Sequence, residues 1–167
     1  MSKSHFKAAA VIASAFVMGG SFVSSGASAQ DEAVSTLKHV SCKGGDHEIR
    51  VVVTNIKSSV GLMVADLYPE KEENFLRSKG RIAQVKFAAK APVTSFCFQT
   101  PEAGNYALAV YHDENANDEF DKKAFGLPDE PFGISNNPRI RFRAPTNAEA
   151  LFEVASDGAN VEIKLKN

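Results

Sequence analysis

Short runs in which apolar and other residues alternate constrain this chain more than any other feature of its sequence. The apolar positions of two such runs are Ile49, Val51 and Val53, and Val161, Ile163 and Leu165. Because successive side chains of a β-strand point to opposite faces of the sheet, a period of two is typical of half-buried strands. Both runs are predicted to be strands.

Six further runs between these two are short and rich in Val, Ile, Phe or Tyr: residues 60–67, 82–88, 93–99, 105–112, 140–144 and 149–155. Such residues favour strands, and clusters of Gly, Pro, Asp, Lys and Ser separate several of the runs. A single stretch, residues 71–78 around Phe75 and Leu76, fits a helical turn. Seven or eight short strands with this punctuation predict an all-β fold, a β-sandwich of immunoglobulin-like or transthyretin-like type.

The first 29 residues have the pattern of an export signal. Lys3 and Lys7 precede a run of small and apolar residues, and Ala27-Ser28-Ala29 fits the small-x-small rule for cleavage before Gln30. The alternative is a retained anchor, but glycine and serine interrupt the run, which is shorter than the ~20 residues that a bilayer requires. We therefore expect a signal peptide at 1–29, an N-terminal arm at 30–47 and a β-sandwich domain at 48–167. The mature protein would be periplasmic or secreted, with no membrane span.

The charge of the chain argues against one class of partner. Without the two lysines of the signal, 17 Lys and Arg residues remain against 20 Asp and Glu residues. A slightly acidic chain lacks the basic surface that nucleic-acid binding requires. The expected partner is an unknown molecule of the envelope or the extracellular space.

Cys42 and Cys97 are the two cysteines of the chain. An exported protein folds in an oxidising compartment, so the sequence predicts a disulfide between them. The alternative is a pair of buried thiols that never meet. A different structural prediction concerns Tyr106, which follows the turn residue Gly104 at the start of a strand. That position is typical of a tyrosine corner, in which the hydroxyl donates back to the backbone.

Residues 113–138 break the alternating pattern and form the longest connection of the predicted sandwich. Apolar side chains are nevertheless embedded in it: Phe120, Phe125, Leu127, Phe132 and Ile134. Long connections without secondary structure are uncommon in compact domains, and they are either packed and functional or flexible. The embedded aromatic residues favour one long packed loop.

Oxygen-bearing side chains alternate at the start of this connection: Asp113, Asn115, Asn117, Glu119 and Asp121. Alternate residues of a loop that wraps a cation converge on one point, and Ca²⁺ takes six to eight oxygen ligands. The spacing matches the first nine positions of a helix-loop-helix calcium loop. These five residues are therefore the candidate ligands of a Ca²⁺ ion.

Departures from that motif exclude a true EF-hand. Its sixth position is Asp118 where glycine is expected, and its twelfth is Ala124 where a glutamate would close the site. The shorter cradle resembles dockerin-like and thrombospondin-like calcium loops, with closure left to a backbone carbonyl, water, Asp129 or Glu130. The alternative is a structural loop held by hydrogen bonds, since Asp and Asn favour loops in any case.

Catalytic patterns are weak in this sequence. His112 next to Asp113 suggests a general base, but consecutive strand residues point to opposite faces. The histidines and cysteines lack zinc-ligand spacing, and there is no nucleophile elbow or phosphate loop. A non-enzymatic binding or structural module is the favoured interpretation, with an enzyme using His112 and Asp113 as the less favoured one. A carbohydrate or peptide binder using Phe125 and Phe132 is the other alternative.

The run GNYALAVYHDENANDEFDKKAFGLPDEPFGISNN resembles the signature of a bacterial exported family labelled domain of unknown function 2141. The resemblance covers most of residues 48–165 and rests on the G-x-Y, H-D-x-N-x-N, G-x-P-x-E-P-x-G and S-N-N elements. It implies a β-sandwich related to carboxypeptidase-regulatory-like and transthyretin-like domains. It implies no established activity, and it draws attention to residues 112–137.

Overall fold

The computed structural model describes residues 42–140 and 143–166 of the chain. The predicted signal peptide, 1–29, and residues 30–41 of the predicted arm lie outside the described residues. The described part contains eight strands: β1 (Glu48–Thr54), β2 (Leu62–Pro69), β3 (Ala83–Ala88), β4 (Thr94–Gln99), β5 (Gly104–Asp113), β6 (Phe132–Ile134), β7 (Phe152–Val154) and β8 (Ala159–Lys164). Short helical elements join them: the 3₁₀ turns η1 (Glu72–Asn74), η2 (Ser78–Gly80) and η3 (Ala124–Gly126), and the helix α1 (Asn147–Ala150).

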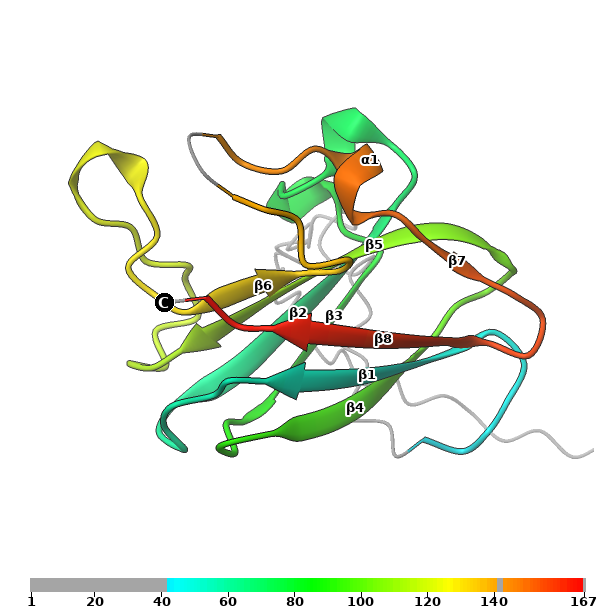
Figure 1. Cartoon of the computed structure of the whole chain (residues 1–167), viewed down its shortest axis with the longest axis horizontal. Coiled ribbons are helices and arrows are strands. Elements are labelled where there is room, and N and C mark those ends of the chain that lie inside the picture. The colour runs from blue at the N-terminus through cyan, green and yellow to red at the C-terminus, as the bar shows by residue number, and fades with distance from the viewer. Residues whose placement is uncertain (1–41, 141–142, 167) are drawn as a thin grey trace, which may run out of the picture.

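Two sheets face each other, so the predicted all-β sandwich is confirmed (Figure 1). The smaller sheet has the order β4-β1-β8, with β1 antiparallel to β4 and parallel to β8. The larger sheet has the order β3-β2-β5-β6, and β7 pairs with β5 beyond the end of β6. In the described residues, no helix is long and apolar enough to cross a membrane.

The main core lies between the two sheets and is built by the alternating residues that predicted the strands. Buried side chains of this core include Ile49, Val51, Val53, Met63, Leu67, Phe96, Phe98, Leu108, Val110 and Ile163. A second, smaller cluster lies on the other face of the larger sheet: Tyr68, Phe75, Ala107, Ile134 and Ala150. The turns η1 and η2 flank Phe75 and Leu76, so the helical character predicted for this stretch is confirmed as two short 3₁₀ turns.

The disulfide between Cys42 and Cys97 is present, with the two Cα atoms 5.3 Å apart. Beside it, the buried carboxylate of Glu48 accepts hydrogen bonds from the backbone N–H groups of Lys43, at 2.7 Å, and Gly44, at 3.1 Å. The first described residues are thereby fixed against β1 and β4. The tyrosine corner is confirmed as well, because the Tyr106 hydroxyl donates to the carbonyl of Glu102 at 3.1 Å.

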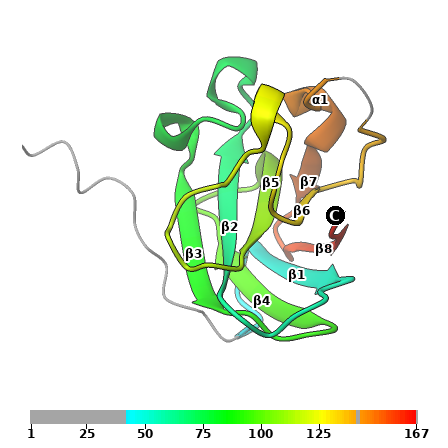
Figure 2. The same cartoon turned by 90° about the vertical axis from the view of Figure 1, so that its left-hand side faces the viewer.

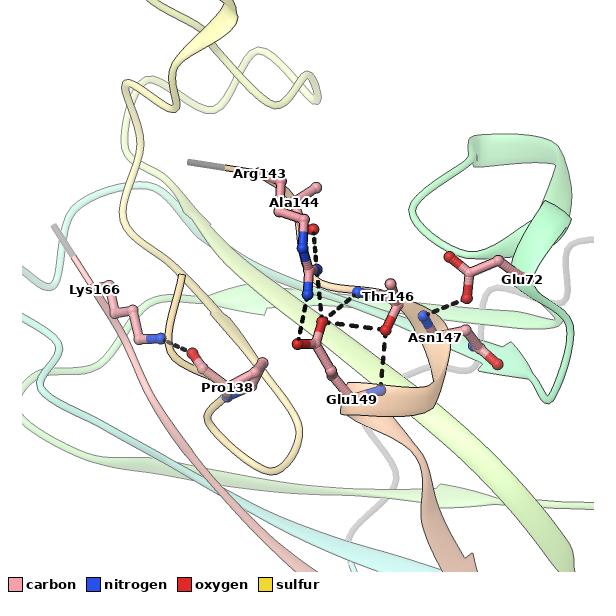
Figure 3. Close-up of polar contacts among 8 residues, drawn as sticks. All are labelled: Glu72, Pro138, Arg143, Ala144, Thr146, Asn147, Glu149 and Lys166. Carbon is pink, nitrogen blue, oxygen red and sulfur yellow. Dashed lines mark hydrogen bonds and ion pairs between the residues drawn. The ribbon is translucent and has the colours of Figure 1, made fainter. Parts of the chain in front are cut away.

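The strand predicted over residues 149–155 is wrong in its first part, where α1 forms instead. Thr146 caps the helix in a capping box: its hydroxyl accepts from the Glu149 N–H, and its own N–H donates to the Glu149 carboxylate at 2.8 Å (Figure 3). Arg143 holds that carboxylate from the other side, with two contacts of 2.8 Å. A capping box satisfies amide groups at the start of a helix, so residues 147–150 turn before the chain extends again as β7.

The strand predicted over residues 140–144 is also wrong for the residues described there. Ile140, Arg143 and Ala144 lie outside any strand, and residues 141–142 are not described. Proline at positions 138 and 145 cannot donate to a strand ladder, which disfavours pairing on either side of this stretch. Ile140 packs against the second apolar cluster instead.

The strand β6 lies inside the connection that showed no periodic pattern. Its three residues pair with β5, with Val110 opposite Gly133. Ser135 follows the strand and fixes it in place, because its buried hydroxyl accepts from Leu108 N–H at 3.0 Å and donates to the carbonyl of Ala150 at 2.5 Å. A strand of three residues is too short to reveal a period in the sequence.

Candidate functional site

The loop after β5 covers the outer face of the larger sheet, the face that points away from the main core. Figure 2 shows it passing over β2 and β3. Phe120 packs between Tyr111 and Phe132, with ring centroids 5.3 Å and 5.9 Å away. Lys86 of β3 contacts the Asp118 carboxylate at 2.7 Å. The part of the loop around Phe120 is therefore packed, as the sequence predicted, whereas Phe125 and Leu127 further along are exposed.

Asp113, the last residue of β5, organises the first turn of this loop. Its side chain is fully buried. One carboxylate oxygen accepts from the backbone N–H of Asn117 at 3.1 Å, and the other accepts from the N–H of Asp118 at 2.9 Å. These two hydrogen bonds satisfy both oxygens of the buried carboxylate, and they bend the next residues around it.

The amides of the next two candidate ligands point to Asp121. Asn115 donates to one oxygen of this carboxylate at 2.7 Å, and Asn117 donates to the same oxygen at 3.2 Å. The side-chain oxygen of Asn115 accepts from the backbone N–H of Asn117 at 3.0 Å. Four of the five predicted ligands thus share one hydrogen-bonded loop: Asp113, Asn115, Asn117 and Asp121.

The fifth predicted ligand, Glu119, does not join this group through its side chain. Its residue is exposed, and its backbone N–H donates to the Asn117 side chain at 2.8 Å. The seventh position of a helix-loop-helix calcium loop contributes a backbone carbonyl, so a turned-out side chain is compatible with that geometry.

Asp118 adopts the backbone conformation that the motif assigns to glycine. Its φ is 67°, in the left-handed region. Residues other than glycine seldom enter this region, although Asp and Asn do so more readily than most. The sharp turn at the sixth position is therefore made without glycine, and Lys86 pairs with the side chain that results.

Glu130 reaches back to the loop from just before β6. It is 7% exposed, and its Oε2 accepts from the backbone N–H of Asp121 at 3.2 Å. Its Oε1 is buried without a hydrogen-bond partner among the described residues. Burial raises the pKa of this carboxyl, and repulsion from Asp113 and Asp121 raises the same pKa further, while the backbone N–H groups of Asp121 and Glu114 lower it. The neighbouring Asp129 is exposed and pairs with Lys123 at 3.2 Å.

The carboxylates of the loop are not drawn together to metal-binding distance. A metal site of this kind needs three His, Cys, Asp or Glu side chains whose ligand atoms lie within 4.8 Å of one another. Among the described residues, one group meets this condition: Cys42, Glu48 and Cys97. The two sulfurs of that group form the disulfide, so they cannot bind a metal as thiolates. A cation in the loop would have to draw the loop oxygens inward.

The side chains of His112 and Asp113 have different hydrogen-bond partners. The His112 ring is fully buried, and its Nε2 lies 2.7 Å from the carbonyl oxygen of Val60. Its Nδ1 lies 3.8 Å from the Glu114 carboxylate. Asp113 points to the other face of β5, where it binds the backbone of the loop.

The two aromatic residues proposed for carbohydrate or peptide binding differ in exposure. Phe125 lies at the projecting tip of the loop, in η3, and its side chain is completely exposed. Phe132 is half-buried in the cluster with Phe120, so its prediction as an exposed contact residue is wrong. Leu127, two residues after Phe125, is also largely exposed.

A buried polar cluster on the outer face of the larger sheet was missed by the sequence reasoning. Asp66 of β2 accepts from the Gln84 amide at 2.7 Å and from the Tyr68 hydroxyl at 3.4 Å, and Arg81 lies 3.7 Å away. Burial raises the pKa of Asp66, and Arg81 lowers it by a smaller amount. The signal in the sequence was an aspartate within an otherwise apolar strand, a residue seldom buried without a partner.

Residues 51–164 match the model of a family described as an uncharacterized protein conserved in bacteria (DUF2141). No curated protein and no solved structure matches the chain.

Proposed function

The chain belongs to the DUF2141 family of bacterial proteins, and we propose that it is an exported, non-enzymatic β-sandwich module whose loop after β5 binds a calcium ion. The export signal pattern and the disulfide support the location, periplasmic or secreted. Its partner would be a molecule of the envelope or the extracellular space. The two-sheet architecture supports a relation to carboxypeptidase-regulatory-like and transthyretin-like domains.

The observation that carries this proposal is the position of Asp113. A fully buried carboxylate begins the loop, and both its oxygens accept backbone N–H groups of the following turn. Asn115, Asn117 and Asp121 place further hard oxygen atoms on the same turn. Calcium prefers such oxygen ligands in a flexible loop, whereas softer metals prefer nitrogen and sulfur.

A structural loop held by its own hydrogen bonds is the competing interpretation. The Asn amides already offset part of the charge of Asp121, so the loop can fold without a cation. His112 has no catalytic role in the proposal, because its imidazole binds the Val60 carbonyl and does not meet Asp113. Affinity is expected to be weak, with a dissociation constant on the order of 10⁻⁴ to 10⁻³ M, as in extracellular calcium modules.

Thermal unfolding of the mature protein, with calcium or with a chelator, tests the proposal. At tenfold excess over the dissociation constant, binding to the folded state adds about 1.4 kcal/mol to the free energy of unfolding. Asp113→Ala and Asp121→Ala should each remove that gain. Asp157→Ala, which removes an exposed carboxylate from the turn between β7 and β8, should retain it. Equal effects of calcium and of sodium or magnesium at matched ionic strength would contradict calcium binding.

Carbohydrate or peptide binding is the second candidate function, and the complete exposure of Phe125 favours it. An exposed aromatic ring at a loop tip can stack on a sugar ring or fill a pocket of a peptide partner. Glycan and peptide arrays probed with wild type and Phe125→Ala test this function. Phe132→Ala should have less effect on such binding, because that ring packs on Phe120.

A further inference from the structure

Glu130 has a carboxylate oxygen that the hydrogen bonds of the fold leave unused. The residue is 93% buried, since 7% of its surface is exposed. Its Oε2 accepts from the Asp121 N–H, whereas its Oε1 is buried without a partner in the described part of the chain. Buried polar atoms of proteins almost always have a hydrogen-bond partner, so this oxygen is available to a ligand.

Two other acidic residues of the loop act on the charge of Glu130. Asp113 and Asp121 both repel the Glu130 carboxylate, and Asp113 is fully buried. The two lysines that contact the loop pair with other acids, Lys86 with Asp118 and Lys123 with Asp129. Backbone and amide donors offset part of the charge of Asp113 and Asp121, whereas among the described residues no basic side chain pairs with Glu130. A bound cation would offset the repulsion that remains.

Glu130 also joins two parts of the loop that are distant in sequence. Between Asp121 and Glu130, residues 122–128 form a projecting finger that carries Phe125 at its tip (Figure 1). Its base is closed by the bridge between Lys122 and Pro128 and by the hydrogen bond from Asp129 N–H to the Asp121 carbonyl, at 2.9 Å. A ligand held by Glu130 and the turn around Asp113 would lock that base.

We propose that Glu130 is the closing ligand of the cation site, supplying the carboxylate that a helix-loop-helix calcium loop takes from its twelfth position. This inference rests on the proposed binding of calcium by the loop. A carboxylate donor from outside the nine-residue turn adds to Asp113 and Asp121 and completes an oxygen-only site. The bound ion would then fix the finger, residues 122–128, against the sandwich.

Isothermal titration with Ca²⁺ at constant ionic strength tests this assignment on the mature protein. Glu130→Gln keeps the shape of the side chain and an acceptor for the Asp121 N–H, but it removes the charged donor. We expect at least a tenfold increase in the dissociation constant for Glu130→Gln. The matched control is Asp129→Asn, which removes one carboxylate from the adjacent, exposed position. It should change the constant less than threefold.

Trypsin cleavage after Lys122 and Lys123 provides a second measurement, because both lysines are exposed on the finger. Calcium should slow this cleavage at least fivefold in wild type and in Asp129→Asn, and should leave its rate unchanged in Glu130→Gln. If Glu130→Gln does not fold, Glu130→Asp replaces it. The shorter side chain keeps the charge but withdraws the donor, so the same loss of affinity and protection is expected.

Two outcomes would overturn the assignment in distinguishable ways. Equal calcium affinity in wild type, Glu130→Gln and Asp129→Asn would remove Glu130 from the site and leave calcium binding by the loop intact. An equal loss of calcium affinity in both variants would mean that Glu130 acts only through its negative charge at a distance and does not bind the ion. If wild type itself binds no calcium, the proposed function and this inference fail together.

Discussion

The rings of Tyr111 and Phe120 lie with their centroids 5.3 Å apart, so the aromatic side chain of the loop rests on the outer face of β5. Phe132 closes the same cluster from β6. The turn around Asp113 is thus held at one end by a strand and at the other by this aromatic contact. Its conformation depends on packing as well as on hydrogen bonds.

Replacing Phe120 with alanine should therefore destabilise the protein. The variant loses two aromatic contacts and part of a half-buried ring, which we expect to lower the free energy of unfolding by about 1 to 2 kcal/mol. Urea denaturation measures the change. Phe125→Ala is the matched control, because the same side chain is completely exposed there and its removal should cost less than about 0.5 kcal/mol.

Reduction of the disulfide should have a larger effect. Cys42 and Cys97 are separated by 55 residues, and the loop-entropy model assigns about 4 kcal/mol to a cross-link of this span. The Cys42→Ala/Cys97→Ala variant should unfold at a correspondingly lower urea concentration. Thiol titration of the denatured, unreduced protein checks the premise, and two reactive thiols per chain would refute it.

Gly133 of β6 lies directly against the end of β8. A Cβ atom at this position would lie 2.4 Å from Cγ2 of Ile163 and 3.2 Å from the carbonyl oxygen of Lys164. Gly133→Ala should therefore overpack the core and lower stability by about 1 to 3 kcal/mol. Gly45→Ala is the control, since a Cβ there meets only the Gln99 side chain, at an ordinary 3.4 Å. Equal stability of the two variants would contradict the prediction.

Glu149 should make the stability of the α1 region depend on pH. The hydrogen bonds from Arg143 are the largest contribution that lowers its pKa, to about 2 from an ordinary value of 4.5. A carboxyl whose pKa is lower in the folded state stabilises that state above its unfolded pKa. The stabilisation is then lost as the pH falls from about 4.5 towards 2.

Wild type should accordingly be more stable than Glu149→Gln at pH 6. The difference in stability between the two proteins should decrease as the pH falls from about 4.5 towards 2. Thermal unfolding across the range measures it. The same comparison in an Arg143→Ala background should show a smaller dependence on pH, because the largest cause of the shift is absent. A difference that stays constant down to pH 2 would contradict the assignment.

The sequence was most informative where one face of a strand is buried. The alternation of Ile49, Val51 and Val53 predicted β1 because burial selects the residue type at every second position. It was least informative where the strand preference of individual residues competes with a helix cap formed by neighbouring side chains. Residues 149–155 contain strand-forming residues, but the capping box between Thr146 and Glu149 starts a helix first.

The site was predicted in the same uneven way. The alternate spacing along the chain predicted four candidate ligands that lie in one hydrogen-bonded turn: Asp113, Asn115, Asn117 and Asp121. For the ligand that closes the site, the sequence left several alternatives, and Glu130 was one of them. Glu130 comes near the turn because the chain returns to β6 after the finger. That approach is set by packing of Phe120 and Phe132, which spacing alone does not encode.

The parallel pairing of β1 with β8 has a consequence for how the chain is made. Ile49 lies opposite Ala159, so β1, the middle strand of the smaller sheet, has β4 as its one neighbour until residues 159–164 are available for pairing. Until then the nascent chain presents an open strand edge and an uncovered apolar face, which are features that promote aggregation. The smaller sheet is therefore completed only once residues 159–164 pair with β1, and a chaperone that shields strand edges would bind the chain before that step.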